Sequence, residues 1–168
     1  DLDAVRRVVS TVEDLRVVVT AAGVVWGGAP VWDMPGAAWQ EVFDVNVTGT
    51  YGVIAAAVPR LLDQPEPRTG RIVALASAGA SRGLPHMAAY SAAKHGVNGM
   101  TKSLAREVGA QGVTVNAICP GIVITDIIKN NGPQTAAAMG MSFEEMVDLF
   151  SQESSIKRPN TVEEVAAM

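Results

Sequence analysis

Three short runs rich in β-branched residues alternate with two long helical patterns, and this alternation constrains the fold more than any other feature. The runs cover residues 17–20, 71–77 and 113–118, and the helical patterns cover about 37–62 and 87–108. An apolar run without polar alternation is typical of a strand buried on both faces. Strands that alternate with helices predict βαβ units. We therefore expect an open α/β fold with a parallel sheet.

The segments outside this alternation complete the expected outline. Residues 3–13 carry valines at helical spacing, which predicts an amphipathic helix. Beyond residue 122 we expect loops and short helices, with Ser142 and Thr161 as N-cap residues. A bend is expected in the helix over 37–62, which contains Gly49, Gly52 and Pro59.

Charge and cysteine content exclude several classes of function. The formal net charge of −4 provides no basic field for nucleic acid or anionic lipid. Cys119 is the only cysteine, so no internal disulfide can form, which favours a reducing compartment. The uninterrupted apolar stretches are far shorter than the roughly 20 residues that span a bilayer. No histidines and carboxylates have metal-ligand spacing. We expect a cytoplasmic protein without membrane, nucleic-acid or metal partners.

Tyr90 and Lys94 are the strongest candidates for chemistry. Their separation of four residues in the helix expected over 87–108 places both side chains on one helical face. A lysine ammonium beside a tyrosine hydroxyl favours the phenolate and lowers the pKa of the tyrosine. Because an unperturbed tyrosine has a pKa of about 10, such lowering would allow proton transfer at neutral pH. The spacing alone also fits an unrelated surface pair.

Ser77 ends the strand expected over 71–77. A hydroxyl at that position can donate a hydrogen bond to a substrate carbonyl oxygen, although an isolated serine more often caps a turn. In open α/β sheets, ligands bind at the carboxyl ends of the strands. Gly23 and the Pro120-Gly121 pair follow the other two strands, so the pattern predicts a ligand site at this edge.

Five segments in order resemble the short-chain dehydrogenase/reductase family. The active-site segment runs from Ser77 to Tyr90-Ser91-Ala92-Ala93-Lys94. The other four are residues 19–23 for the family's Asn-Ala-Gly turn, 44–49 for its helix with an active-site asparagine, 113–125 for its nicotinamide-binding segment and 158–166 for its last helix. The resemblance implies a Rossmann-like, doubly wound parallel sheet, represented here by its central and C-terminal portion.

The resemblance implies catalytic roles for Asn46, Ser77, Tyr90 and Lys94. Tyr90 would be the general acid/base, donating a proton to the carbonyl oxygen in reduction and accepting one in oxidation. Lys94 would lower the pKa of Tyr90 and bind the nicotinamide ribose, and Ser77 would orient the substrate oxygen. Asn46 would hold a water that links Lys94 to solvent.

The resemblance also implies NAD or NADP as the cofactor, which supplies the hydride chemistry. Gly121 would leave room for the nicotinamide ring because it lacks a Cβ. The residues expected to contact the cofactor are Ala22, Gly23, Asn46, Tyr90, Lys94, Pro120, Gly121, Val123 and Thr125.

The sequence departs from the family in two respects. The Asn-Ala-Gly turn reads Ala21-Ala22-Gly23, which removes an amide that would brace the strand end. The Gly-rich phosphate-binding loop and the last strand have no counterpart. We therefore expect residues 1–168 to form a single, partial Rossmann-like domain, and we expect the activity to belong to a longer parent chain.

The expected function is that of an NAD(P)-dependent oxidoreductase that interconverts a secondary alcohol and a ketone. A 3-oxoacyl thioester reductase of the same family, or a non-catalytic member that binds a nucleotide or a partner, are the alternatives. By resemblance, residues 126–155 correspond to the family's substrate-covering segment. Their methionines favour an apolar substrate pocket, but they fit an ordinary core equally well. A homo-oligomer, either dimer or tetramer, is also expected. The small residues Ala92, Gly96 and Gly99 would either meet a partner helix or pack on the sheet.

Overall fold

A computed structural model describes all 168 residues and contains a three-stranded parallel sheet. The strands are β1 (Val17–Thr20), β2 (Arg71–Leu75) and β3 (Thr114–Ile118), in the order β1-β2-β3. Pairing continues beyond β2, because the amide of Ala76 donates to Ile118 O and the amide of Ala78 donates to Pro120 O, both at 2.8 Å. The predicted parallel sheet is confirmed, and this late pairing holds the segment around Ser77 against the end of β3.

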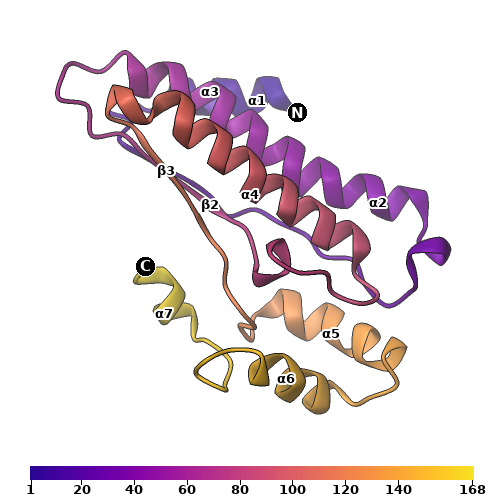
Figure 1. Cartoon of the computed structure of the whole chain (residues 1–168). Helices are drawn as coiled ribbons and strands as arrows, with labels where there is room; N and C mark the ends of the chain where they lie inside the picture. The colour runs from indigo at the N-terminus through magenta and orange to yellow at the C-terminus, as the bar shows by residue number, and fades with distance from the viewer.

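Long helices connect the strands, as the alternation predicts (Figure 1). Between β1 and β2 run α2 (Gly36–Phe43), a π-helical segment over Asp44–Gly49, and α3 (Thr50–Leu62). Between β2 and β3 runs α4 (Ala88–Val108). The departure from α-helical geometry lies in the π-helical segment, which includes Gly49, whereas Pro59 is accommodated inside α3.

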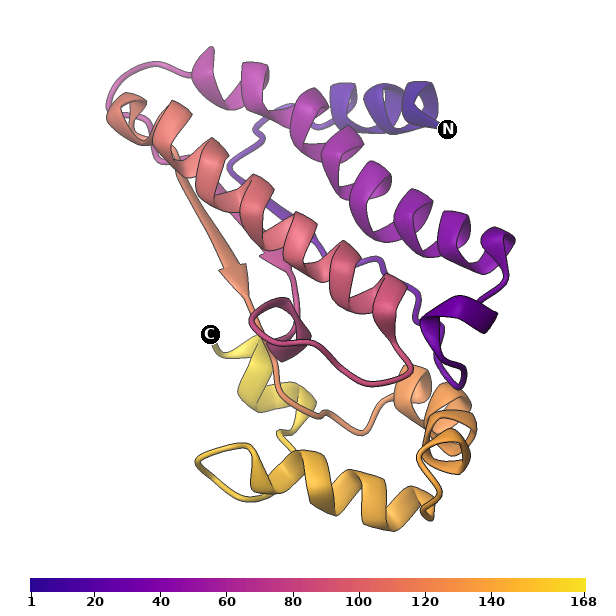
Figure 2. The same cartoon turned by 45° about the vertical axis from the view of Figure 1, so that its right-hand side comes forward.

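The main core lies between one face of the sheet and the two helices α3 and α4. Val18, Ile72 and Val115 share this face and form one buried cluster with Ile54 and Leu61 of α3 and with Leu104 and Val108 of α4. Both views show α3 and α4 on the same side of the strands (Figures 1 and 2). This placement follows from two successive right-handed crossovers in a sheet of sequential order.

The opposite face of the sheet is largely uncovered. Val17 is 57% exposed and Val19 is 56% exposed. The prediction that the strands are buried on both faces is therefore wrong for β1, because no helix of this chain packs along it on that side. Near the carboxyl edge, α7 (Val162–Ala166) approaches this face, and Val162 and Val165 border a hollow together with Val73.

The remaining helices lie at the two ends of the chain. At the N-terminus, α1 (Leu2–Ser10) packs against α3. Beyond β3, α5 (Asp126–Ala138) and α6 (Phe143–Gln152) pack against each other below the sheet edge (Figure 2). Both predicted N-caps are confirmed, because Ser142 and Thr161 each form a capping box at the start of α6 and α7.

The continuous helix over Gly36–Leu62 is long and apolar enough to cross a membrane by length and composition alone. A core helix of a folded domain passes the same test. Here Ile54 and Leu61 of this helix pack into the core of the sheet, and Asn46 is fully buried within it. Packing against the sheet therefore explains part of the apolar composition of this helix.

Candidate active site

The structure brings together four of the predicted site residues around one pocket at the carboxyl edge of the sheet. Ser77, Tyr90, Pro120 and Gly121 all line this pocket. They come from three separate segments, namely the loop after β2, the first turn of α4 and the loop after β3. The parallel order of the strands places these segments at one edge, as the pattern predicts.

Ser77 has an extended backbone and precedes a short 3₁₀ turn over Ala78–Ala80. Its Oγ accepts a hydrogen bond from the amide of Gly79 at 3.1 Å, so the side chain caps this turn. The same hydroxyl lies at the wall of the pocket that Tyr90 also lines. Capping and substrate contact are therefore compatible, because a hydroxyl can accept one hydrogen bond and donate another.

Burial raises the pKa of Tyr90 above its ordinary value of 10.0, and the nearby Ser77 side chain opposes this shift only in part. The sequence predicts the opposite direction, with Lys94 lowering the pKa of Tyr90. In this structure loss of solvation is the larger effect, so the net direction is upward, and the effect of Lys94 on this pKa stays a prediction. Tyr90 is consequently a protonated phenol at neutral pH.

Lys94 lies behind Tyr90, one helical turn further along α4. Its Nζ is 5.7 Å from the centroid of the Tyr90 ring and donates a hydrogen bond to Leu75 O at 2.8 Å. Burial lowers the pKa of Lys94, and the neighbouring Cys119 partly offsets this effect. The single bond to Leu75 leaves two of the three ammonium donors available for other groups.

Asn46 is fully buried and projects from the π-helical segment toward the end of β1. Its Nδ2 donates to Val24 O and to Val42 O, both at 2.8 Å, whereas its Oδ1 has no hydrogen-bond partner. A Cβ at Gly23 would lie 2.8 Å from this Oδ1 and 3.4 Å from Lys94 Nζ. The missing side chain of Gly23 therefore leaves a small space that faces both polar atoms.

The predicted cofactor residues after β3 border two separate hollows. Pro120 and Gly121 line the pocket that holds Tyr90, while Val123 and Thr125 line the hollow beside the uncovered sheet face. Val123 pairs in parallel with Asn160, whose amide donates to Ile122 O at 2.9 Å. The segment before α7 thus braces the loop after β3. Ala22, by contrast, is exposed after β1.

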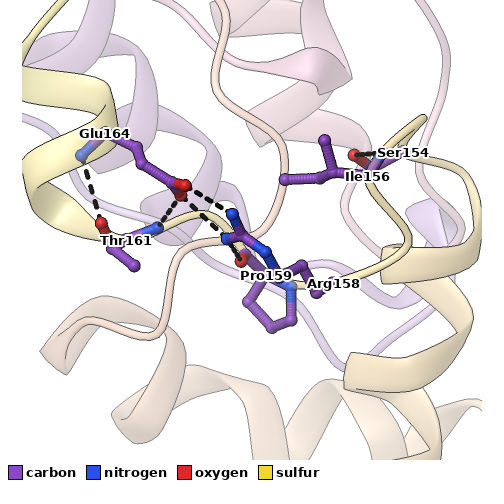
Figure 3. Close-up of polar contacts among 6 residues, drawn as sticks. All are labelled: Ser154, Ile156, Arg158, Pro159, Thr161 and Glu164. Atoms are coloured by element: carbon purple, nitrogen blue, oxygen red, sulfur yellow. Dashed lines mark hydrogen bonds and ion pairs between the residues drawn. The ribbon is translucent and has the colours of Figure 1, made fainter.

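A polar clamp fixes that bracing segment (Figure 3). The Arg158 guanidinium donates to both carboxylate oxygens of Glu164, at 2.9 and 2.5 Å. The amide of Thr161 donates to Glu164 as well, at 2.8 Å. The hydrogen bond from Arg158 and that from the Thr161 amide lower the pKa of Glu164 to about 2. These contacts tie the start of α7 to the chain that follows α6.

The walls of the pocket come largely from α5, α6 and the loop before α4. Eight of its lining residues fall within 126–155, the segment that the sequence predicts to cover the substrate. Sequence reasoning missed the only two charged residues that line this pocket, Arg82 and Glu153. Arg82 and Glu153 are too far apart in the sequence for their pairing to be inferred from spacing. The position of Arg82 between Ser77 and Tyr90 was the one available hint that it lies near the site. The other lining residues are Val25, Ala78, Gly79, Leu84, Met87, Ile122, Ile127, Ile128, Asn131, Gly132, Thr135, Met146 and Phe150.

The two histidines lie outside the pocket. The ring of His95 contacts Ser91 O at 2.8 Å on the exposed side of α4. His86 adopts a left-handed backbone with φ of 60°, and its carbonyl accepts a hydrogen bond from the amide of Gly28. Neither imidazole therefore contributes to the pocket lining.

The chain is similar in sequence to known oxidoreductases. The family described as enoyl-(acyl carrier protein) reductase matches residues 2–168. A D-beta-hydroxybutyrate dehydrogenase of Rhizobium meliloti is 36% identical over 137 residues, which is 81% of this chain and 52% of that protein. The 3-oxoacyl-[acyl-carrier-protein] reductase FabG of Staphylococcus aureus is 38% identical over 123 residues, covering 73% and 48%. The chain thus spans about half the length of these relatives.

Solved structures agree in fold. An actinorhodin polyketide ketoreductase with NADPH superimposes with a TM-score of 0.83 at 34% identity, covering 100% of this chain and 65% of that one. An NAD⁺-bound xylitol dehydrogenase gives a TM-score of 0.90 at 24% identity, covering 99% and 66%. The second likeness supports the Rossmann-like fold alone.

Proposed function

Because this chain belongs to the short-chain dehydrogenase/reductase family, we propose that it carries the catalytic residues of an NAD(P)-dependent oxidoreductase that interconverts a secondary alcohol and a ketone. The observation that carries the proposal is the meeting of Ser77 and Tyr90 at one pocket, with Lys94 and Asn46 buried behind them. The intact set argues against a non-catalytic member of the family.

Tyr90 transfers the proton in this proposal. During reduction its hydroxyl donates a proton to the substrate oxygen, and during oxidation the phenolate accepts a proton from the alcohol. Burial keeps the phenol protonated at neutral pH, which favours the donor role in ketone reduction. Ser77 donates a hydrogen bond that orients the substrate oxygen and stabilises its developing negative charge. After the transfer, the nearby Lys94 ammonium stabilises the phenolate.

In this proposal Asn46 holds a water that links Lys94 to solvent, and the Tyr90 phenolate regains its proton from solvent along this route. The unpartnered Oδ1 of Asn46 and Lys94 Nζ face the same space beside Gly23. A water there would accept from Lys94 and donate to Asn46, which satisfies a buried acceptor that otherwise lacks a partner.

NAD or NADP supplies the hydride when it is bound. The residues present fit such a group, since Gly23 and Gly121 leave the strand ends free of side chains and Lys94 keeps donors available. The residues that would hold the cofactor are Ala22, Gly23, Asn46, Tyr90, Lys94, Pro120, Gly121, Val123 and Thr125.

A 3-oxoacyl thioester reductase is the second candidate. The name of the Staphylococcus aureus relative and the largely apolar lining of the pocket both favour it. Residues 126–155 would cover either substrate. Turnover of a 3-oxoacyl thioester at least about tenfold above that of simple ketones, compared by kcat/KM, would separate the two candidates.

Assembly and location form part of the same proposal. Ala92, Gly96 and Gly99 are exposed on α4, and no atom lies within 4 Å of a Cβ built at Gly99. They do not pack on the sheet, so they leave a face on which a second copy could approach closely. A cytoplasmic homo-oligomer, dimer or tetramer, is the corresponding expectation.

Tyr90→Phe tests the chemistry most directly. It removes the acid/base hydroxyl, and we expect kcat of the longer parent chain to fall by about 10²–10⁴-fold. Cofactor affinity, measured by fluorescence titration, should stay within about twofold. Tyr51→Phe is the matched control, because Tyr51 is the other tyrosine and is half exposed on α3. If Tyr90→Phe retains more than about a tenth of the activity, the assigned role of Tyr90 is wrong.

A further inference from the structure

Arg82 and Glu153 form an ion pair across the wall of the pocket, with Arg82 Nη2 lying 2.6 Å from Glu153 Oε2. Arg82 belongs to the loop between Ser77 and Tyr90, and Glu153 is the C-cap residue of α6. The two side chains are 42% and 40% exposed, so the pair lies where the pocket meets solvent. None of the other seventeen lining residues carries a charge at neutral pH, because Tyr90 remains protonated.

We propose that Glu153 masks Arg82 and thereby makes the pocket select substrates that are uncharged beyond the reacting carbonyl. This inference rests on the proposed function, because it assigns a substrate class to the same pocket. In it, Arg82 and Glu153 are specificity-determining residues, whereas the reacting atoms remain with Tyr90 and Ser77.

The electrostatics of the pair support this assignment. A free guanidinium in an apolar pocket would bind a carboxylate with two parallel hydrogen bonds. Here the carboxylate of Glu153 already lies beside the guanidinium, 2.6 Å from Nη2. An acidic substrate would have to displace Glu153 and would then lie beside its negative charge, and like charges placed together oppose binding. An uncharged substrate leaves the pair intact.

The lining of the pocket favours the same substrate class. Apolar side chains from α5 and α6, including Ile127, Ile128, Met146 and Phe150, face the space near Tyr90. These side chains stabilise an uncharged, apolar substrate body by burying its surface. A charged group would lose solvation in this setting without gaining an unpaired partner.

The test compares a 3-oxo acid with its methyl ester, which differ chiefly in one negative charge. Dissociation constants of both compounds are measured by ligand-observed NMR titration of the chain. The variants are Glu153→Gln, Arg82→Gln and the control Glu144→Gln. Glu144 is exposed in the first turn of α6 and does not line the pocket, so its substitution removes the same charge elsewhere on that helix.

We expect the wild type to bind the ester more tightly than the acid. Partly exposed ion pairs contribute up to about 1 kcal/mol, which corresponds to about a fivefold change in a dissociation constant. Glu153→Gln should therefore improve the affinity for the acid relative to the ester by about three- to fivefold. Arg82→Gln should weaken the affinity for the acid relative to the ester, because the negative charge of Glu153 is then left unpaired. Glu144→Gln should leave it unchanged.

Three results would overturn the inference. The ratio of the dissociation constants for acid and ester could be equal in all four proteins, it could shift as much in Glu144→Gln as in Glu153→Gln, or neither compound could bind. Turnover of the ester by the longer parent chain is measured in parallel with the reduced cofactor. A shifted affinity ratio without hydride transfer would overturn the proposed function and leave the assignment of Arg82 and Glu153 standing.

Discussion

Replacing Gly23 with alanine should destabilise the chain through one defined steric contact. The new methyl group would lie 2.8 Å from Asn46 Oδ1, closer than carbon atoms of this kind approach polar atoms, and 3.4 Å from Lys94 Nζ. No positive φ is involved at Gly23, so the effect is purely steric.

Asn46 cannot move aside without loss. It is fully buried, and its amide holds Val24 O and Val42 O at 2.8 Å. Each such hydrogen bond contributes about 1 kcal/mol, and overpacking of a tight site costs about 1–3 kcal/mol. We therefore expect Gly23→Ala to lower the free energy of unfolding by about 1–3 kcal/mol. Loss of turnover should accompany it, because the contact displaces two proposed catalytic groups.

Urea unfolding followed by far-ultraviolet circular dichroism measures the change in free energy. Gly109→Ala is the matched control, since Gly109 has helical backbone angles at the end of α4 and open space where its Cβ would be. Alanine is the better helix former by up to about 1 kcal/mol, so this control should be stabilised. An unfolding free energy for Gly23→Ala within about 0.5 kcal/mol of the wild type would refute the reasoning.

Two further predictions concern the ends of the chain. The pKa of Glu164 is about 2 rather than 4.5, so its contribution to stability is present above about pH 4.5 and is lost as the pH falls toward 2. In thermal unfolding, Glu164→Gln should be less stable than the neighbouring control Glu163→Gln near neutral pH and equal to it near pH 2; a constant difference would contradict this. Arg60 donates to Val9 O and Val12 O and so holds the end of α1 against α3. Arg60→Ala should speed amide exchange in α1 by about tenfold or more, because hydrogen bonds to charged groups contribute about 1.5–3 kcal/mol. Exchange in α4 should stay unchanged, with Arg60→Lys intermediate; unaltered exchange in α1 would show that Arg60 does not anchor it.

Element type and order could be predicted because each depends on neighbouring residues. Strands β1 to β3 and helix α4 appear where the apolar runs and helical spacing predict them, within about two residues. The capping boxes at Ser142 and Thr161 are equally local, since each joins residues three apart. The first helix is less accurate: it spans Leu2–Ser10 rather than 3–13, with Thr11 as its C-cap residue.

The sequence alone determined the alternation of strands and helices, the sheet edge that receives Ser77 and Gly23, and the family. The alternation and the sheet edge follow from periodicity and spacing along the chain, which are properties of neighbouring residues. The family follows from the resemblance of five ordered segments to its motifs. Only the tertiary structure decided the direction of the Tyr90 pKa, because burial depends on what surrounds the ring. The same is true of the Arg82–Glu153 pair, which joins residues 71 positions apart through the packing of α6 beside the pocket. Solvation and long-range charge are set by distances in space, and those distances exist only once the elements have packed.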